Sequence, residues 1–360
     1  MNKHSNWLVI LLVMSLLTAS TAFAQEPEGG ETQVHITQVD TSNFPTVTVY
    51  LSVTDNNGEP VYVDPERIVL MEDGEPVDPD QIQGLGEVES ITTLLVMDVS
   101  GSMWYEGKLE AAQEAARAYV NMLRPEDAVG LLSFNEQFDY VQPITTDRDA
   151  IFFAIDSLVA DEDTAMYDAL IEATTILAEA SGRKAIIVLT DGMDNRSRGE
   201  LEDVLTGIGP TGLSISTVGL GNPEHQTAHI AGLDVPALQR LADEAGGQFA
   251  YANDQESLTA LYERLARGFQ SEYIITYTSP GGLRDGLTRQ LTATLGELNS
   301  ESQAAYNPGG LVPEVGEVVN WPLFLGLLGG LLLLLFVPAV AGRLMAGGAR
   351  KSKKPRIKLT

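Results

Sequence analysis

The strongest constraint on the fold is a series of apolar segments that alternate with helix-like segments between residues 91 and 269. Ile91 to Met97 is a nearly continuous apolar run, and Lys184 to Thr190 contains the run Ala-Ile-Ile-Val-Leu. Such runs are typical of strands buried on both faces of a parallel sheet. Strands that alternate with helices predict a doubly wound, mainly parallel α/β sheet. Further strands are expected at 128–134, 213–218 and 248–251, and helices at 109–123, 147–158, 165–180, 235–245 and 255–269.

Segments with the period-two pattern of half-buried strands flank this α/β region on both sides. Val47, Val49 and Leu51 alternate with polar residues before the α/β region, and residues 272–278 alternate in the same way after it. Neither flanking segment has many strands, and a lone hairpin is only marginally stable in water. We therefore hypothesise one small antiparallel β domain with the α/β domain inserted in it; separate tethered hairpins are the alternative. The β segments are 33–90 and 270–306, and the inserted α/β domain is 91–269.

The N-terminus has the pattern of a secretory signal peptide over residues 1–24. Lys3 supplies a positive charge, an apolar run follows, and Ala22-Phe23-Ala24 forms a small-residue cleavage site. An uncleaved anchor helix is the alternative. The Glu- and Gly-rich residues 25–32 are expected to be a disordered acidic segment.

The C-terminus has the pattern of a membrane anchor. Residues 321–342 contain no charged side chain and are numerous enough to cross a bilayer as one transmembrane helix. The basic residues of 343–360 predict a cytoplasmic tail. A buried core helix is the alternative. We expect a single-pass membrane protein with its N-terminal ectodomain outside the cytoplasm, joined to the span by a linker at 307–320.

The charge of the chain restricts its partners. There are 50 acidic residues against 22 basic ones, and every acidic residue lies between positions 25 and 320. Such a surface repels nucleic acid, so no nucleic-acid partner is expected. The chain has no cysteine, which excludes disulfides, thiol catalysis and cysteine-metal sites.

Oxygen-bearing side chains follow two of the predicted strands. Asp98 ends the first strand, Ser100 and Ser102 come next, and Asp191 follows the strand at 184–190. Thr164 precedes the helix that leads into that strand. Because the carboxyl ends of parallel strands share one edge of a sheet, we expect two carboxylates and three hydroxyls to meet there. Hard oxygen ligands select Mg²⁺, Mn²⁺ or Ca²⁺, and Mg²⁺ is the first expectation.

These residues stand in three motifs with a family resemblance. Asp98-Val99-Ser100-Gly101-Ser102-Met103 resembles the metal-ion-dependent adhesion site motif (MIDAS) of von Willebrand factor type A domains. Thr164-Ala165-Met166-Tyr167-Asp168-Ala169 and Val188-Leu189-Thr190-Asp191-Gly192 resemble the second and third motifs of that family. The resemblance covers about residues 91–269 and implies a Rossmann-like α/β fold. Similar flanking β segments, marked here by Glu72-Asp73-Gly74 and Tyr273 to Tyr277, are frequent in exported bacterial proteins with this domain.

The resemblance also implies ligand roles. Ser100, Ser102 and Thr164 would ligate the metal directly, and Asp98 and Asp191 would do so directly or through water. One departure is Asp161-Glu162-Asp163, where many members of the family have glycines. These acids would raise the affinity for the metal and favour Ca²⁺, or discourage an acidic ligand; a solvated loop is the alternative.

The implied function is a cell-surface, adhesion-type module whose metal coordinates an oxygen donor of a protein partner. The first alternative is an accessory or assembly factor that docks in cis on a membrane complex. No enzyme is expected, because no complete catalytic constellation is present. The enzymatic alternative is a serine hydrolase that uses Ser100 or Ser102 with His225, although the sequence has no G-x-S-x-G elbow. The oligomeric state is not predicted.

Three other features of the sequence could indicate a binding site. His225 and His229 have a spacing that suits zinc on a helix, but Asn222-Pro223 indicates a loop there. The stretch from Gly101 to Lys108 does not fit a phosphate-binding loop, because its glycine spacing is too long and Leu109 follows the lysine. Trp104 and Tyr105 would offer an aromatic surface beside the metal, or else pack on the sheet edge.

Overall fold

The computed structural model describes residues 32–84, 90–161, 163–209, 212–221, 233–296, 300–310, 327–328 and 330–331. The predicted signal peptide, cytoplasmic tail and nearly all of the predicted membrane span therefore lie outside the described residues, as do His225 and His229. Within the described residues, no helix is both long and apolar enough to cross a membrane. The chain divides into one compact unit that ends at Gly310 and a second unit over 311–360.

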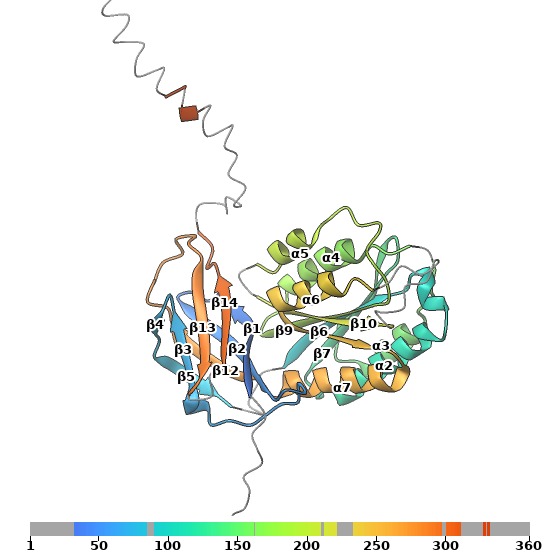
Figure 1. Cartoon of the computed structure of the whole chain (residues 1–360), viewed down its shortest axis with the longest axis horizontal. Helices are drawn as coiled ribbons and strands as arrows, with labels where there is room; N and C mark the ends of the chain where they lie inside the picture. Colours follow the sequence, from blue (N-terminus) through green and yellow to red (C-terminus); the bar gives the residue numbers. More distant parts are fainter. Residues whose placement is uncertain are drawn as a thin grey trace, which may run out of the picture. The chain divides into compact units, whose positions relative to one another are not determined.

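The α/β domain is built on a six-stranded sheet in the order β11-β10-β9-β6-β7-β8 (Figure 1). All neighbouring strands are parallel except β7 and β8, which form an antiparallel hairpin. The predicted doubly wound, mainly parallel sheet is confirmed. The strands are β6 (Ile91–Asp98), β7 (Ala128–Phe134), β8 (Phe138–Thr145), β9 (Arg183–Thr190), β10 (Ser214–Leu220) and β11 (Gly246–Ala252).

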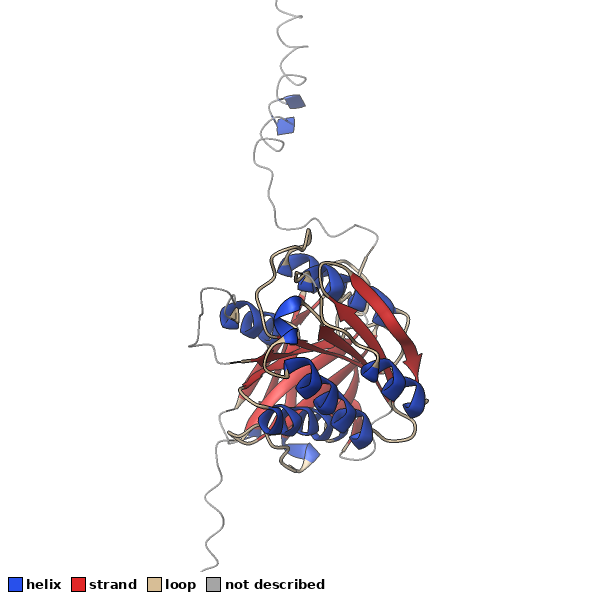
Figure 2. Cartoon of the chain, turned by 90° about the vertical axis from the view of Figure 1, so that its right-hand side faces the viewer, coloured by secondary structure: helices blue, strands red, loops and turns tan. Residues whose placement is uncertain are grey.

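Helices cover both faces of this sheet (Figures 1 and 2). Leu95 and Met97 of β6 belong to one buried apolar cluster and Leu94 and Val96 to the other, because successive side chains of a strand point to opposite faces. Two covered faces explain why the central strands are continuously apolar. One face is covered by α2 (Lys108–Met122), α3 (Arg148–Asp156) and α7 (Gln255–Gln270), and the other by α4 (Met166–Ala178), α5 (Leu201–Gly207) and α6 (Val235–Glu244).

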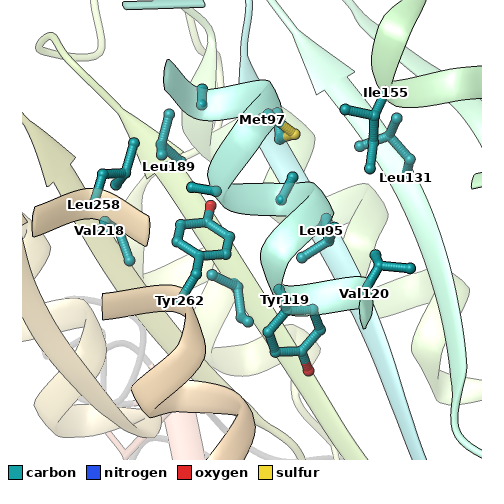
Figure 3. Packing of buried hydrophobic residues seen from close by; sticks show 14 of the residues in the cluster. Leu95, Met97, Tyr119, Val120, Leu131, Ile155, Leu189, Val218, Leu258 and Tyr262 are labelled. Atoms are coloured by element: carbon teal, nitrogen blue, oxygen red, sulfur yellow. The ribbon is translucent and has the colours of Figure 1, made fainter. Parts of the chain in front are cut away.

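Close packing on the first face centres on two tyrosines (Figure 3). Tyr119 of α2 and Tyr262 of α7 are fully buried, and their rings meet edge to face with centroids 6.3 Å apart. The Tyr119 hydroxyl lies 2.6 Å from the Thr93 hydroxyl on β6. This contact fixes α2 on the central strand, and α2 begins just after the Asp98 loop.

The two segments that flank the α/β domain form a sandwich of two four-stranded antiparallel sheets. Each sheet combines both segments, since β12 pairs with β2 in one sheet and β13 pairs with β3 in the other. Their inner faces share one apolar core. The sheets are β1 (Gln33–Asp40), β2 (Thr46–Thr54), β12 (Tyr273–Thr278) and β5 (Pro79–Gln83), and β14 (Glu301–Tyr306), β13 (Arg289–Leu295), β3 (Ile68–Glu72) and β4 (Glu75–Pro76).

The start of the expected linker is held against the sandwich. The Arg284 guanidinium donates to the Pro308 carbonyl over 2.7 Å, and the Asn307 amide donates to the Gly286 carbonyl over 2.9 Å. Gly310 forms a β-bridge with Asp285. Residues 307–310 thus belong to the β domain, and a linker begins no earlier than residue 311.

Candidate metal centre

Asp98 lies at the centre of the site, at the carboxyl end of β6. The register of the parallel strands sets it beside Thr190, the last residue of β9. The Thr190 hydroxyl donates to Oδ2 of Asp98 over 2.6 Å, and the Ser100 amide donates to Oδ1 over 2.8 Å. Asp98 is fully buried. Both carboxylate oxygens are therefore oriented by the strand ends that surround them.

A single turn of 3-10 helix brings the two serines of the first motif together. This turn, η2 (Gly101–Trp104), begins where the Met103 amide donates to the Ser100 carbonyl over 3.0 Å. The hydroxyls of Ser100 and Ser102 lie 3.1 Å apart. The Ser102 hydroxyl donates to Oδ1 of Asp191 over 2.6 Å, which links the first motif to the third.

Thr164 reaches the same edge through the loop that follows β9. The backbone amides of Asn195 and Arg196 donate to the Thr164 carbonyl over 3.1 Å, and the Asn195 side chain accepts from the Thr164 amide. The Thr164 hydroxyl lies against Gly192, where an added Cβ would stand 3.9 Å from it. The structure thus brings all five predicted residues to one place, from three separate loops.

Two buried carboxylates, Asp98 and Asp191, dominate the electrostatics of the site. Burial and the nearby charge of Asp191 raise the pKa of Asp98 to about 6. The Lys108 ammonium contacts Oδ2 of Asp191 at 2.6 Å. The sequence does not predict this contact, because the two residues lie 83 positions apart. The available signal is a lysine six residues after Ser102, just before the predicted helix at 109–123.

The donor set fits a hard divalent cation. It consists of two carboxylates and three hydroxyls, with no sulfur or imidazole. Within the part of the chain that the structure describes, no group of three or more His, Cys, Asp or Glu side chains has a metal-binding arrangement. A metal at this edge would therefore depend on the serine and threonine hydroxyls as well as on the carboxylates.

The neighbouring acids have structural partners of their own. Asp163 pairs with the exposed Arg196 guanidinium, whose Nε lies 2.6 Å from Oδ2. Asp194 accepts hydrogen bonds from the Tyr167 amide and the Ser197 hydroxyl, and so orders the loop after β9. The solvated-loop interpretation accounts for Asp163; Glu162 lies outside the described residues.

Two aromatic side chains border the site on its exposed side. Trp104 is 69% exposed and Tyr105 is 58% exposed, although they lie only two and three residues after Ser102. Neither therefore packs into the sheet edge, and large exposed aromatics of this kind are frequent in protein interfaces.

Comparisons with known proteins found one family match and several similar proteins. Residues 93–193 match the von Willebrand factor type A domain family. The UPF0353 protein of Mycolicibacterium vanbaalenii is 29% identical over 229 residues, which cover 57% of this chain and 68% of that protein. Among solved structures, a von Willebrand factor type A protein from Catenulispora acidiphila matches with a TM-score of 0.46 and 17% identity, over 77% of this chain and 72% of that one. Proximal thread matrix protein 1 from the mussel byssus, with a zinc-occupied MIDAS motif, matches with a TM-score of 0.45 and 16% identity, over 55% of this chain and 49% of that one.

Proposed function

We propose that the von Willebrand factor type A domain of this chain is a metal-dependent protein-binding module. The observation that carries the proposal is the bonded series from Thr190 through Asp98, Ser100 and Ser102 to Asp191. This series holds oxygen atoms from two neighbouring strand ends within hydrogen-bonding distance of one another. Preorganised oxygens of this kind favour a divalent cation, because the ligand side chains themselves need little ordering.

We propose the ligand roles that the family resemblance implies. The hydroxyls of Ser100, Ser102 and Thr164 would ligate the ion, and the carboxylates of Asp98 and Asp191 would balance its charge directly or through water. Mg²⁺ fits this mixture best, because it retains waters and accepts few carboxylates; Mn²⁺ and Ca²⁺ are the alternatives. A water position on the exposed side would be exchanged for an oxygen donor of a protein partner, with Trp104 and Tyr105 supplying the apolar contact.

The proposed binding function differs from the serine-hydrolase alternative, which needs a base beside Ser100 or Ser102. The hydroxyl of Ser102 donates to Asp191, and the Ser100 hydroxyl lies 3.1 Å from that of Ser102. Among the described residues the only histidine is His35, which lies on β1 of the sandwich. An imidazole base would have to come from His225, outside the described residues. A cis-acting accessory role at a membrane uses the same metal chemistry, and differs only in where the partner lies.

Calorimetric titration of the purified full chain with Mg²⁺, Mn²⁺ and Ca²⁺ tests the metal site. We expect one ion to bind per chain, and Asp98→Ala with Thr164→Ala to abolish binding. Asp163→Ala is the matched control, because it removes an acid from the same loop that pairs with Arg196 instead. Unchanged titration of the double variant would refute the site.

Capture of partners with and without a chelator tests the binding function. We expect proteins that are retained only with metal, and retention that Trp104→Ala weakens while metal affinity is unaltered. A partner from the same membrane, recovered in detergent, would support the accessory role, whereas a partner from another cell or a matrix would support adhesion. Retention that is indifferent to metal would contradict both.

We also propose that residues 321–342 anchor the module in a membrane, with 343–360 in the cytoplasm. The charge-free run and the basic residues after it support this proposal. Extraction at alkaline pH and protease accessibility of the C-terminus would test it. Release of the intact chain by alkali would contradict anchoring.

A further inference from the structure

Lys108 places a positive charge inside the candidate metal centre. Its ammonium lies 2.6 Å from Oδ2 of Asp191, and the two side chains are 13% and 0% exposed. Oδ1 of the same carboxylate accepts from the Ser102 hydroxyl. Both oxygens of Asp191 therefore accept hydrogen bonds from protein groups.

The position of Lys108 is not explained by the stability of its helix. It is the first residue of α2, where the helix dipole disfavours a cation. Glu106 and Gly107 just before it have φ angles of +58° and +69°, a conformation that is costly for the non-glycine residue. The ion pair with Asp191 offsets these two free-energy costs, which are the repulsion by the helix dipole and the positive φ of Glu106.

The carboxylates need such a charge. Asp98 and Asp191 are both buried, at 0% and 3% exposed, and the Ser100–Ser102 segment links the two carboxylates by hydrogen bonds. Among the described residues, Lys108 is the basic side chain that contacts either of them. A buried carboxylate without a partner is strongly destabilising.

We infer that Lys108 is an internal counter-ion that takes the place of the divalent cation in the metal-free domain and must release or share Asp191 when metal binds. This inference rests on the proposed metal site. It makes Lys108 the residue that sets the metal affinity: the ammonium stabilises the empty site and opposes the ion. Metal affinity is thereby lower than the oxygen ligands alone would give.

Lys108→Met separates this role from a purely structural one, since it keeps the aliphatic stem and removes the charge. In the full chain we expect the Kd for Mg²⁺, measured by calorimetry, to fall about tenfold or more, because one like charge is removed at contact distance. We also expect a lower Tm without metal and a larger rise in Tm on addition of Mg²⁺. If the ion pair is only structural, Lys108→Met should lower Tm equally with and without metal, and Mg²⁺ should bind as tightly as to wild type or more weakly. That result would overturn the inference.

Arg196→Gln is the matched control. Arg196 is a cation on the same loops, with its amide bonded to Thr164, but its guanidinium pairs with the exposed Asp163. We expect the Kd of this variant for Mg²⁺ to change by less than about threefold, since exposed charges are screened by solvent and salt. An equal gain in both variants would show a general effect of net charge and overturn the specific role of Lys108.

A second measurement needs no variant. Acetylation of Lys108 in the wild-type chain, followed by mass spectrometry, should become several-fold faster when Mg²⁺ is added, because the ammonium leaves its buried partner. If the chain binds Mg²⁺ but the acetylation rate is unchanged, the inference about Lys108 is refuted and the proposed metal site stands. If neither wild type nor Lys108→Met binds any of the three ions, the proposed metal site itself fails and the inference with it.

Discussion

Arg183 and Glu272 form a buried bidentate ion pair across 89 residues of sequence, with Nε to Oε2 at 2.6 Å and Nη2 to Oε1 at 2.8 Å. Arg183 begins β9, the strand that ends at the metal centre, and Glu272 directly precedes β12 of the sandwich. The guanidinium also donates to Ser214 on β10 and to Gln38 on β1. One side chain therefore joins the α/β sheet to both halves of the β domain.

Loss of one partner of this pair should destabilise the protein strongly. Glu272→Gln leaves the Arg183 charge buried without its counter-charge, which costs about 3–5 kcal/mol. Arg183→Met combined with Glu272→Met should cost less than the sum of the single changes, since no unpaired charge is left. Urea unfolding of the three variants measures this; strict additivity would show that the pair is not coupled.

Thr190→Val should weaken metal binding without touching a proposed ligand. The change keeps the shape of the side chain but removes the 2.6 Å hydrogen bond that orients Oδ2 of Asp98. Loss of such an orienting bond typically lowers metal affinity about 10–100-fold. Calorimetry against Mg²⁺ measures the effect. Thr93→Val, on the same sheet but bonded to Tyr119, is the control and should bind metal as wild type does.

Gly246→Ala should destabilise the contact between the two domains. Gly246 has φ +68°, and an added Cβ would lie 2.9 Å from the Ile36 carbonyl and 3.0 Å from the Thr37 carbonyl on β1. Gly74→Ala is the matched control, because Gly74 has φ +85° with no atom within 4 Å of the added Cβ. Both changes incur the left-handed penalty of about 1–2 kcal/mol. We expect the unfolding free energy to fall further for Gly246→Ala, and equal losses would show that β1 moves aside freely.

Alkaline pH should destabilise the protein, and the tyrosines of the sandwich core should account for part of the loss. Tyr277 and Tyr306 are buried and donate to Oε2 of Glu72 over 2.7 and 2.9 Å. Burial raises the pKa of Tyr277 above its usual range and the pKa of Tyr306 to about 12. In the unfolded chain a phenol loses its proton near pH 10, so their contribution is complete below pH 10 and is lost as pH rises towards 12.

Each such phenol should remove about 1.4 kcal/mol of stability per pH unit in that interval. Urea midpoints measured from pH 9 to pH 11 test this, and Tyr306→Phe should make the decline shallower. A decline as steep as that of wild type would assign the effect to other groups.

The metal centre could be located from sequence because four of its five residues lie at or just after the ends of two buried strands. Asp98 and Asp191 come directly after runs that are apolar on both faces, and parallel strands bring such ends to one edge. The order of elements and the resemblance to the second family motif predict the place of Thr164. Its bond to the loop of Asn195 and Arg196 is what fixes its position, and no local pattern indicated that contact.

The sequence pattern did not predict two elements of the α/β domain, β8 and α5. The strand β8 is an edge strand with mixed exposure, so it lacks the apolar run of its buried neighbours. The helix α5 is short, with a narrow buried face at Leu201 and Val204, and gives too few turns for a helical period. The hydrophobic periodicity of an exposed or short element is weak, because few of its side chains are buried.

The sequence by itself determined the type and order of the buried elements, and therefore the edge at which Asp98, Ser100, Ser102, Thr164 and Asp191 meet. Hydrophobic period is a local property, and strand ends in a parallel sheet share one side. Only the tertiary structure decided that β2 pairs with β12, that Arg183 is buried against Glu272, and that Lys108 lies on Asp191. These contacts join residues 83 or more positions apart, and their partners are selected by packing and charge in three dimensions.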